Sequence, residues 1–324
     1  MLIFAPAASR EFAANVANAL GQPLAELEER DFEDGEHKMR PMVPVRGADA
    51  YVIQSLHGGP DQSCNDKLCR LLFLIATLRD HGARRVTAVA PYLAYARKDR
   101  RTKPHDPLTL RYVAQLFEAV GTDRIVTLEA HNLSAFENAF RVPALSLSLG
   151  DILGPRAAEL PAMLGAAPDA PLVVASPDPG GVKRAQLLRE TLQSQLGREI
   201  GAAFMEKRRS GGVVTGSLLA GDVTGAHVLL VDDLVASGGT LLRAARACLD
   251  AGASAVSGLA AHGLFVGDAA ATLSAPELSR LIVSDTVPPF RLSGAFRPQI
   301  VSAASGFAGA IRRLAEDQAR PAAP

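Results

Sequence analysis

The sequence contains no tryptophan, only three cysteines and no excess of either charge. Cys64, Cys69 and Cys248 are odd in number and lack the paired spacing of zinc motifs, so we expect no thiolate-bound metal and a reducing cytoplasm. Because 34 basic residues balance 34 acidic residues, no net field favours nucleic acid or an anionic membrane surface. Any anion must therefore be bound by a local arrangement of residues.

Long apolar runs are missing as well. No stretch reaches the roughly 18 apolar residues of a membrane-spanning helix. The N-terminal MLIFAPAASREF has no basic leader and meets Arg10 and Glu11 directly, which predicts a first strand rather than a signal peptide. These absences predict a soluble cytoplasmic protein. Its 324 residues, 48% of them hydrophobic, suffice for two domains of ordinary size.

Short apolar runs rich in β-branched residues alternate with helical patterns along the chain. This alternation predicts an α/β protein with mostly parallel sheets flanked by helices on both faces. Strands are expected at residues 51–54, 86–90, 125–128, 172–175, 227–231, 256–260 and 281–284. Helices are expected at residues 68–81, 110–120, 182–196, 241–250 and 303–318.

A segment rich in Ala, Pro and Gly interrupts the alternation at residues 154–171. Its four prolines and weak polar pattern predict a linker, with a domain boundary just before it. We therefore expect two domains at residues 1–150 and 151–297. Residues 298–324 are expected to form a closing helix that returns to the first domain, followed by a frayed tail.

The stretch VLLVDDLVASGGTLLRAA, residues 228–245, runs from an apolar strand into two acids and then into a glycine pair before a helix. Backbone amides and the positive end of the helix dipole would converge there and suit a phosphate. The acids would repel that phosphate and better suit ribose hydroxyls or a Mg²⁺ ion. A plain strand-to-helix turn explains a lone Gly-Gly-Thr about equally well. The residues concerned are Asp232, Asp233, Ser237, Gly238, Gly239 and Thr240.

A second segment, SPDPGGVKRAQ at residues 176–186, also joins an apolar run to a helix through a glycine pair. Gly180 and Gly181 allow backbone amides to approach an anion at the helix start. By itself the segment fits an ordinary turn equally well. Asp178 adds a carboxylate to this second potential phosphate cradle.

Two segments concentrate positive charge. PYLAYARKDRRTKPHDPLT, residues 91–109, has the cation density of a mobile anion clamp, although alone it fits a solvated basic surface better. EKRRSGG, residues 206–212, places cations before a flexible glycine pair and alone fits a basic hairpin tip. The cations are Arg97, Lys98, Arg100, Arg101 and Lys103 in the first segment, and Lys207, Arg208 and Arg209 in the second.

Two further segments carry polar side chains at turns. DFEDGE, residues 31–36, alone predicts a turn with exposed acids. LEAHN, residues 128–132, places His131 just after a predicted strand, at the edge where open α/β sheets bind ligands. A lone histidine there is more often structural than a ligand.

Taken together and in this order, these segments resemble the ribose-phosphate pyrophosphokinases, and the resemblance covers almost the whole chain. It also includes AHGLFVGDAA at residues 261–270 and IVSDTVPP at residues 282–289. The resemblance implies two phosphoribosyltransferase-like domains and the transfer of a diphosphoryl group from ATP to ribose 5-phosphate, with Mg²⁺. The alternative drawn from the 228–245 loop alone is a phosphoribosyltransferase, for which the N-terminal half would be superfluous.

The resemblance also implies roles for individual residues. For ribose 5-phosphate, Asp232 and Asp233 hold the ribose hydroxyls while the loop Ser237, Gly238, Gly239 and Thr240 holds the 5-phosphate. For ATP, the implied residues are Phe32, Asp34 and Glu36 at the adenine, with Arg97, Lys98, Asp99 and His131. Asp178, Gly180 and Gly181 form the pyrophosphate loop, His131 and Asp178 bind Mg²⁺, and Lys207 and Arg209 are catalytic. The adenine segment comes from a neighbouring subunit in this family, which implies a homo-oligomer, either a hexamer or its dimer unit.

Two positions depart from the family pattern. Lys98 stands where the family usually has glutamine, and Ala236 stands before Ser237 where an acid is usual. The missing acid removes a candidate proton acceptor or sugar contact. A regulatory relative that binds nucleotide or a catalytic partner without efficient turnover is therefore a second hypothesis.

Overall fold

The computed structural model describes residues 1–210, 213–294 and 296–319, with the side chains at 207–217 and 317–319 outside that description. The chain divides into two compact units, Met1–Leu147 with Ala303–Pro324, and Ser148–Ser302. Each unit is built around a mostly parallel sheet with flanking helices, which confirms the predicted α/β class. Among the described helices, none is long and apolar enough to cross a membrane.

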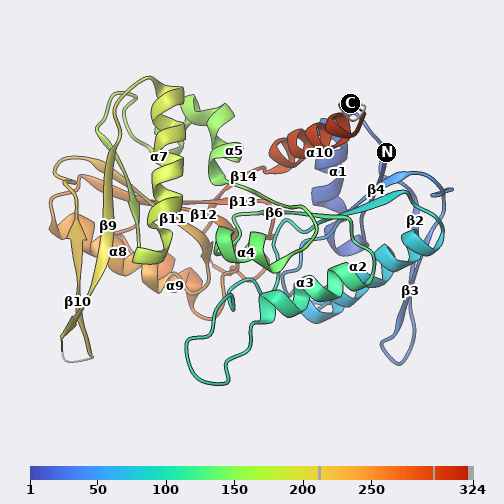
Figure 1. Ribbon diagram of the computed structural model, residues 1–324. Coiled ribbons are helices and arrows are strands. Elements are labelled where there is room, and N and C mark those ends of the chain that lie inside the picture. The colour runs from blue at the N-terminus through green and yellow to red at the C-terminus, as the bar shows by residue number, and fades with distance from the viewer. Residues whose placement is uncertain (211–212, 295, 320–324) are drawn as a thin grey trace, which may run out of the picture. The chain divides into compact units, whose positions relative to one another are not determined.

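The first unit contains a five-stranded parallel sheet in the order β1-β4-β5-β6-β7. Helices α1 and α10 lie on one face of it, and α2 and α3 lie on the other (Figure 1). The strands are β1 (Leu2–Phe4), β4 (Asp49–Ile53), β5 (Arg85–Val89), β6 (Arg124–Leu128) and β7 (Ala144–Leu147), and the helices are α1 (Arg10–Leu20), α2 (Cys64–Asp80), α3 (Thr109–Ala119), α4 (Leu133–Ala139) and α10 (Ala304–Ala319). A short 3-10 turn, η1 (Ala7–Ser9), precedes α1.

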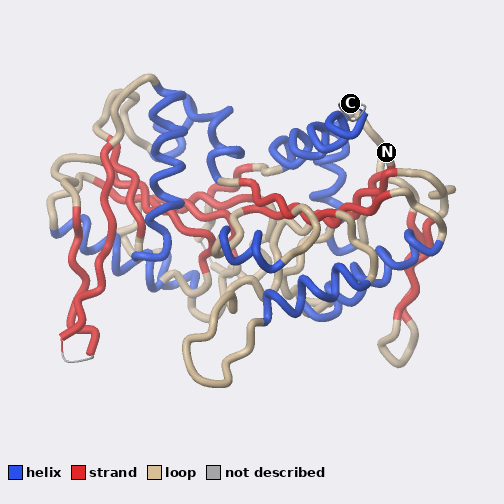
Figure 2. Tube along the Cα trace, in the orientation of Figure 1, coloured by secondary structure: helices blue, strands red, loops and turns tan. Residues whose placement is uncertain are grey.

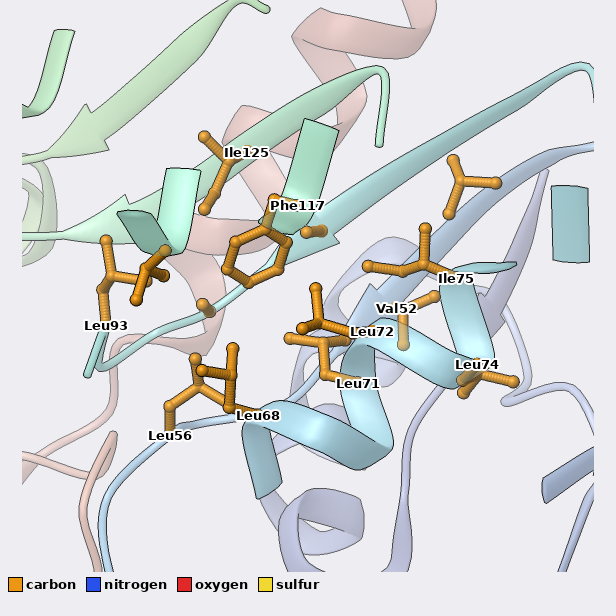
Figure 3. Close-up of a cluster of buried hydrophobic side chains, with 14 of the residues drawn as sticks. Val52, Leu56, Leu68, Leu71, Leu72, Leu74, Ile75, Leu93, Phe117 and Ile125 are labelled. Atoms are coloured by element: carbon orange, nitrogen blue, oxygen red, sulfur yellow. The ribbon is translucent and has the colours of Figure 1, made fainter. Parts of the chain in front are cut away.

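The core of this unit forms where α2 and α3 pack on the sheet (Figure 3). Val52, Leu71, Ile75, Phe117 and Ile125 are all fully buried there. Each such side chain contributes about 1.5–3 kcal/mol through removal of its apolar surface from water. The apolar positions of α2 therefore fix how the helix lies against the strands that carry the polar turns.

The closing helix α10 belongs to the first unit. Phe307 on α10 meets Phe12 on α1 edge to face, with ring centroids 5.6 Å apart and an interplanar angle of 85°. Arg312 donates to the carbonyl oxygen of Ala19 at 3.2 Å, and Arg124 of β6 donates to the carbonyl oxygen of Leu314 at 3.5 Å. Residues at the two ends of the sequence thus share one layer.

A separate antiparallel hairpin stands apart from the five-stranded sheet in Figure 2 and consists of β2 (Leu27–Asp31) and β3 (His37–Pro41). Neither strand is apolar enough to be recognised by hydrophobic pattern. Glu28 instead pairs across the hairpin with Lys38 at 2.8 Å and with Arg40. Cross-strand charge pairs therefore help fix its register.

The second unit contains a seven-stranded sheet in the order β10-β9-β8-β11-β12-β13-β14, parallel except for the β9–β10 pair. Helix α7 lies on one face, and α8 and α9 lie on the other (Figure 1). The strands are β8 (Leu172–Ser176), β9 (Gly201–Ser210), β10 (Val213–Ala220), β11 (His227–Val235), β12 (Ala255–Gly263), β13 (Arg280–Ser284) and β14 (Gln299–Val301). The helical segments are α5 (Leu149–Leu153), η2 (Gly154–Glu159), α6 (Leu160–Leu164), η3 (Pro179–Gly181), α7 (Val182–Leu196), α8 (Gly239–Asp250) and α9 (Ala269–Leu273).

The prediction of a linker at residues 154–171 is wrong for residues 154–164, while residues 165–171 form neither helix nor strand. Residues 154–164 form η2 and α6, and Leu160 and Leu164 are buried in the second unit. Pro155 and Pro161 stand in the first turns of these helices, where a missing N–H breaks no helical hydrogen bond. The two prolines are therefore compatible with these helices rather than signs of a linker.

The acid pair, Asp232 and Asp233, lies within β11 rather than after it. The strand was expected to end at residue 231, but its parallel pairing with β12 continues to Val235, which is registered with Gly263. The first five residues of β11 are buried, as expected for a strand covered on both faces. Main-chain pairing therefore continues after the apolar pattern has stopped.

Candidate functional site

The two glycine-containing turns of the second unit follow neighbouring strands. Strands β8 and β11 pair in parallel, with Ala175 registered with Leu230. Because parallel strands end at the same edge, the segment after β8 and the acid pair of β11 come to one edge of the sheet. The predicted pyrophosphate and ribose-phosphate segments are thus brought together within this unit.

The Gly-Gly turn, residues 178–181, is closed by its own acid. Asp178 Oδ1 accepts hydrogen bonds from the amides of Gly180 at 2.8 Å and Gly181 at 3.2 Å. Ser176 Oγ donates to the carbonyl oxygen of Asp178 at 2.6 Å. A Cβ on Gly181 would lie 2.7 Å from Ser176 Oγ, so the turn requires glycine there. An anion entering this cradle must compete with Asp178 for the two amides.

Arg184, on the first turn of α7, faces the acid pair. Its Nη1 lies 3.7 Å from Asp232 Oδ1 and 3.9 Å from Asp233 Oδ1. All three side chains are largely shielded from water, with 11% of Arg184, 22% of Asp232 and 7% of Asp233 exposed. Arg184 therefore links the helix after the Gly-Gly turn to the acids of the neighbouring strand.

Burial and the neighbouring Asp233 raise the pKa of Asp232 to about 8, and Arg184 opposes that shift. Two neighbouring carboxylates in such a shielded site repel each other, so the pair holds one proton at neutral pH. The amide of Asp233 donates to Asp232 Oδ1 at 2.9 Å and also favours the charged form.

This raised pKa predicts how stability depends on pH in the substrate-free protein. The folded chain keeps a proton on Asp232 that the unfolded chain loses near pH 3.8, so this group makes the free energy of unfolding fall as pH rises towards about 8. We expect Asp232→Asn to remove that part of the pH dependence. Denaturant titrations of both proteins between about pH 5 and pH 8 test this, and parallel stability curves would contradict it.

The loop between β11 and α8 depends on a left-handed glycine. Gly238 has φ +82°, and a Cβ there would lie 2.6 Å from Leu273 Cδ2 of α9. Helix α8 begins at the next residue, so its first-turn amides follow this glycine directly. Thr240 Oγ1 accepts from Arg243 Nη2 at 3.3 Å, which adds a cation beside the predicted phosphate loop.

In the first unit, the turn that carries His131 is joined to the basic loop, residues 97–106. Asn132 Nδ2 donates to Asp99 Oδ2 at 2.7 Å, and Asn132 Oδ1 accepts from the amide of Ala135 and caps α4. Glu129 takes a positive φ of 44°, and its amide donates to the carbonyl oxygen of Leu147 at 2.8 Å. His131 is exposed at this turn. Asp99 and His131, expected at one nucleotide site, therefore lie on connected segments.

The DFEDGE segment forms the turn of the β2–β3 hairpin. The amide of Phe32 donates to the carbonyl oxygen of Glu36 at 2.8 Å, and Gly35 takes φ +91°. Asp34 and Glu36 are exposed, with the amide of Glu36 donating to Asp34 Oδ1 at 3.1 Å. Arg30 lies 4.9 Å from the centre of the half-buried Phe32 ring. The acids are thus presented at a turn whose shape is set by main-chain bonds.

The remaining predicted residues are less closely defined. The main chain of Lys207 and Arg209 lies in β9, opposite Ser217 and Val214 of β10, and their side chains fall outside the described residues. Across the described part of the chain, no group of three or more His, Cys, Asp or Glu residues is arranged to hold a metal ion. His131 lies in the first unit and Asp178 in the second.

Sequence reasoning missed Arg184 and Arg243 as site residues. Arg184 follows the glycine pair at 180–181 by three residues, and Arg243 is the fifth residue of α8, just after its first turn. A cation so close to a helix N-terminus opposes the helix dipole, and that misplaced charge was the available signal.

Comparison with known proteins adds independent evidence. The N-terminal domain of ribose phosphate pyrophosphokinase matches residues 1–121, a phosphoribosyl transferase domain matches residues 161–261, and a phosphoribosyl synthetase-associated domain matches residues 214–320. The chain is 33% identical over 327 residues to the ribose-phosphate pyrophosphokinase of Agrobacterium fabrum, with 98% of each chain covered. It is 35% identical over 315 residues to that of Caldanaerobacter subterraneus subsp. tengcongensis, covering 97% of this chain and 94% of the relative.

The fold is similar to that of a solved structure from the same family. The crystal structure of phosphoribosylpyrophosphate synthetase from Mycobacterium smegmatis matches with a TM-score of 0.83 at 31% identity, covering 98% of this chain and 99% of that one. The resemblance inferred from the separate sequence segments is confirmed at full length. The chain therefore belongs to the ribose-phosphate pyrophosphokinase family, with phosphoribosyltransferase domains.

Proposed function

We propose that this member of the family transfers the diphosphoryl group of ATP to O1 of ribose 5-phosphate, giving 5-phosphoribosyl 1-diphosphate and AMP. The observation that carries the proposal is the meeting of the Gly-Gly turn and the acid pair at one sheet edge, with Arg184 between them. A site for a sugar diphosphate needs hydroxyl acceptors beside anion donors, and this edge supplies both.

In the second unit, each segment has a separate task. Asp232 and Asp233 accept the ribose hydroxyls, and the loop from Ser237 to Thr240 holds the 5-phosphate at the start of α8. The amides of Gly180 and Gly181 receive the diphosphate once Asp178 releases them. The positive φ of Gly238 and the shielded acid pair support these assignments, because both are specialised features of one edge.

In the first unit, the proposed tasks concern the nucleotide. The Phe32 ring stacks on adenine, and Asp34 and Glu36 recognise its polar edge. Arg97, Asp99 and His131 place the phosphates. The hydrogen bond from Asn132, next to His131, to Asp99 supports this assignment. If this hairpin serves a neighbouring subunit, the enzyme works as a homo-oligomer, and we propose that assembly.

The family generally uses Mg²⁺, and we propose that His131 in the first unit and Asp178 in the second each serve as a protein ligand for Mg²⁺. Mg²⁺ commonly takes only one or two protein ligands and completes its shell with water and substrate phosphates. Asp178 fits this role because its carboxylate offers hard oxygen ligands, and its Oδ1 is already held at the turn by the amides of Gly180 and Gly181. When bound, the ion would neutralise charge on the phosphate oxygens.

The transfer itself requires alignment and charge neutralisation more than covalent participation by the protein. The ribose O1 hydroxyl attacks the β-phosphorus of ATP and releases its proton to solvent. The bond from that phosphorus to the bridging oxygen breaks, and AMP leaves with this oxygen on its α-phosphate. Lys207 and Arg209 stabilise the charge that grows on the transferring phosphates. The acid pair accepts the sugar hydroxyls through its carboxylate oxygens when it is ionised.

A regulatory relative remains the second candidate, because Ala236 stands where the family usually has an acid. The test is to incubate the purified protein with ATP, ribose 5-phosphate and Mg²⁺, and to follow AMP and 5-phosphoribosyl 1-diphosphate together, beside Ala236→Asp. Equal formation of both products by the unaltered chain is the expected result. Activity appearing only in Ala236→Asp would favour the regulatory relative, and inactivity of both would count against the proposed transfer.

A further inference from the structure

The basic loop of the first unit folds around one of its own acids. A single oxygen, Asp106 Oδ2, accepts hydrogen bonds from Lys98 Nζ at 2.6 Å, Thr102 Oγ1 at 2.8 Å and the Thr102 amide at 2.9 Å. The Lys103 amide donates to the same oxygen at 3.0 Å. Four donors on one carboxylate oxygen give the loop a defined shape without any ligand.

The main chain closes the same loop. The amide of Asp106 donates to the carbonyl oxygen of Lys103 at 3.2 Å, and Arg101 Nε donates to the carbonyl oxygen of Asp106 at 3.1 Å. The amide of Leu110 donates to the carbonyl oxygen of Lys98 at 3.3 Å, which joins the start of the loop to α3. Lys98 is therefore held through both its side chain and its main chain.

The charges fit this arrangement. Hydrogen bonds from Lys98 and then Thr102 hold the pKa of Asp106 well below its usual range, so the carboxylate stays ionised through the neutral range. The Lys98 and Asp106 side chains are 33% and 22% exposed, and such partial shielding strengthens an ion pair relative to one in open water. Arg97 and Arg100, in contrast, are exposed.

We propose that Lys98 and Asp106 form a clasp that fixes the resting shape of the basic loop, so that Lys98 positions the loop and leaves nucleotide contacts to other cations. The proposal deepens the proposed function, on which its kinetic part rests. The clasp explains how the chain can carry lysine where the family usually has glutamine, because the charge of the Lys98 ammonium is balanced by Asp106 inside the loop. Asp106 and Lys98 are then positioning residues for Arg97 and Asp99.

Limited trypsin digestion of the substrate-free protein tests the clasp independently of activity. Fragment masses report cleavage after Arg100 and Arg101, both exposed in the loop. We expect Lys98→Met and Asp106→Asn each to speed this cleavage about fivefold, the effect of losing one partly exposed charged hydrogen bond. Lys103→Met is the matched control, because it removes a cation from the same loop while keeping the amide bonded to Asp106, and it should leave the rate unchanged.

A double variant and the ATP kinetics complete the test. If the clasp exists, Lys98→Met with Asp106→Asn digests no faster than either single variant, and both single variants raise the KM for ATP by a similar factor. A Lys98→Met variant that alone weakens ATP binding, with unchanged digestion and normal kinetics in Asp106→Asn, would overturn the proposal and return Lys98 to the nucleotide. Digestion still reports on the clasp if no protein forms product, so failure of the proposed function is distinguishable.

Discussion

Replacing Gly238 by alanine is expected to raise the KM for ribose 5-phosphate at least about tenfold and to destabilise the second unit. The left-handed conformation at φ +82° costs a non-glycine residue about 1 kcal/mol. The new methyl group would also lie 2.6 Å from Leu273 Cδ2, and such overpacking costs about 1–3 kcal/mol. Relief of that overlap displaces the loop from α9 and misaligns the start of α8. Steady-state kinetics and thermal unfolding measure the two effects.

Gly225→Ala separates strain from overlap. Gly225 lies in the same unit at φ +69°, but a Cβ there would meet no atom within 4 Å. We expect Gly225→Ala to lower the free energy of unfolding by about 1 kcal/mol, the cost of the left-handed conformation, and to leave the KM for ribose 5-phosphate unchanged. If Gly238→Ala behaved like Gly225→Ala in both measurements, the close packing of the loop on Leu273 would have no role in phosphate binding.

Much of the fold was predictable because buried parallel strands leave a strong local signal. The run from Val228 to Val231 is apolar throughout since both faces of β11 are covered, and the helix after it shows a clear apolar stripe. The hairpin β2–β3 left no such signal. Its strands are mostly polar and depend on pairs such as Glu28 with Lys38, which form only after the chain has turned back.

Proline accounts for the wrong linker. A proline in the interior of a helix interrupts it, whereas a proline in the first turn is well tolerated. The sequence alone did not reveal that Pro161 occupies a first turn. Leu160 and Leu164 are buried, and burial of their apolar side chains stabilises the helix. Tertiary packing therefore overrode a local signal.

The candidate site was predictable where its parts are adjacent in sequence. The glycine pairs and Asp232 with Asp233 stand in short segments whose chemistry is readable directly. Arg184 was not recognised, because its partners on β11 are distant in sequence and only the parallel pairing of β8 with β11 brings them near. The clasp of Lys98 and Asp106 was missed for a different reason. A dense run of cations does not indicate which of them is paired with a nearby carboxylate.

Arg184→Met is expected to lower kcat/KM for ribose 5-phosphate by about a hundredfold. Breaking a buried ion pair by removing one partner costs about 3–5 kcal/mol, and the 3.7 and 3.9 Å separations place this case at or below the lower end. Methionine keeps much of the volume, so the loss arises chiefly from charge. Without the cation, the pair keeps its proton to higher pH, and we expect it to accept the sugar hydroxyls of the proposed reaction less well.

The pH profile distinguishes this role from simple support of the fold. Arg184 lowers the pKa of Asp232, so its removal raises that pKa further above its present value of about 8. The acid limb of kcat/KM should then move to higher pH in Arg184→Met and return part of the way in Arg184→Lys. Lys183→Met is the matched control, because Lys183 is exposed on the same turn and should leave the profile unchanged.

Coupling to Asp232 gives the final discrimination. In Asp232→Asn the carboxylate that Arg184 approaches most closely is already neutral, so a second change at Arg184 should cost much less than it does alone. Additive losses would mean that Arg184 acts elsewhere, and an unmoved acid limb would exclude it from setting the ionisation of the pair. Non-additive losses with a shifted limb would identify Arg184 as the residue through which the helix after the Gly-Gly turn controls the charge of the acids that we propose to bind the sugar.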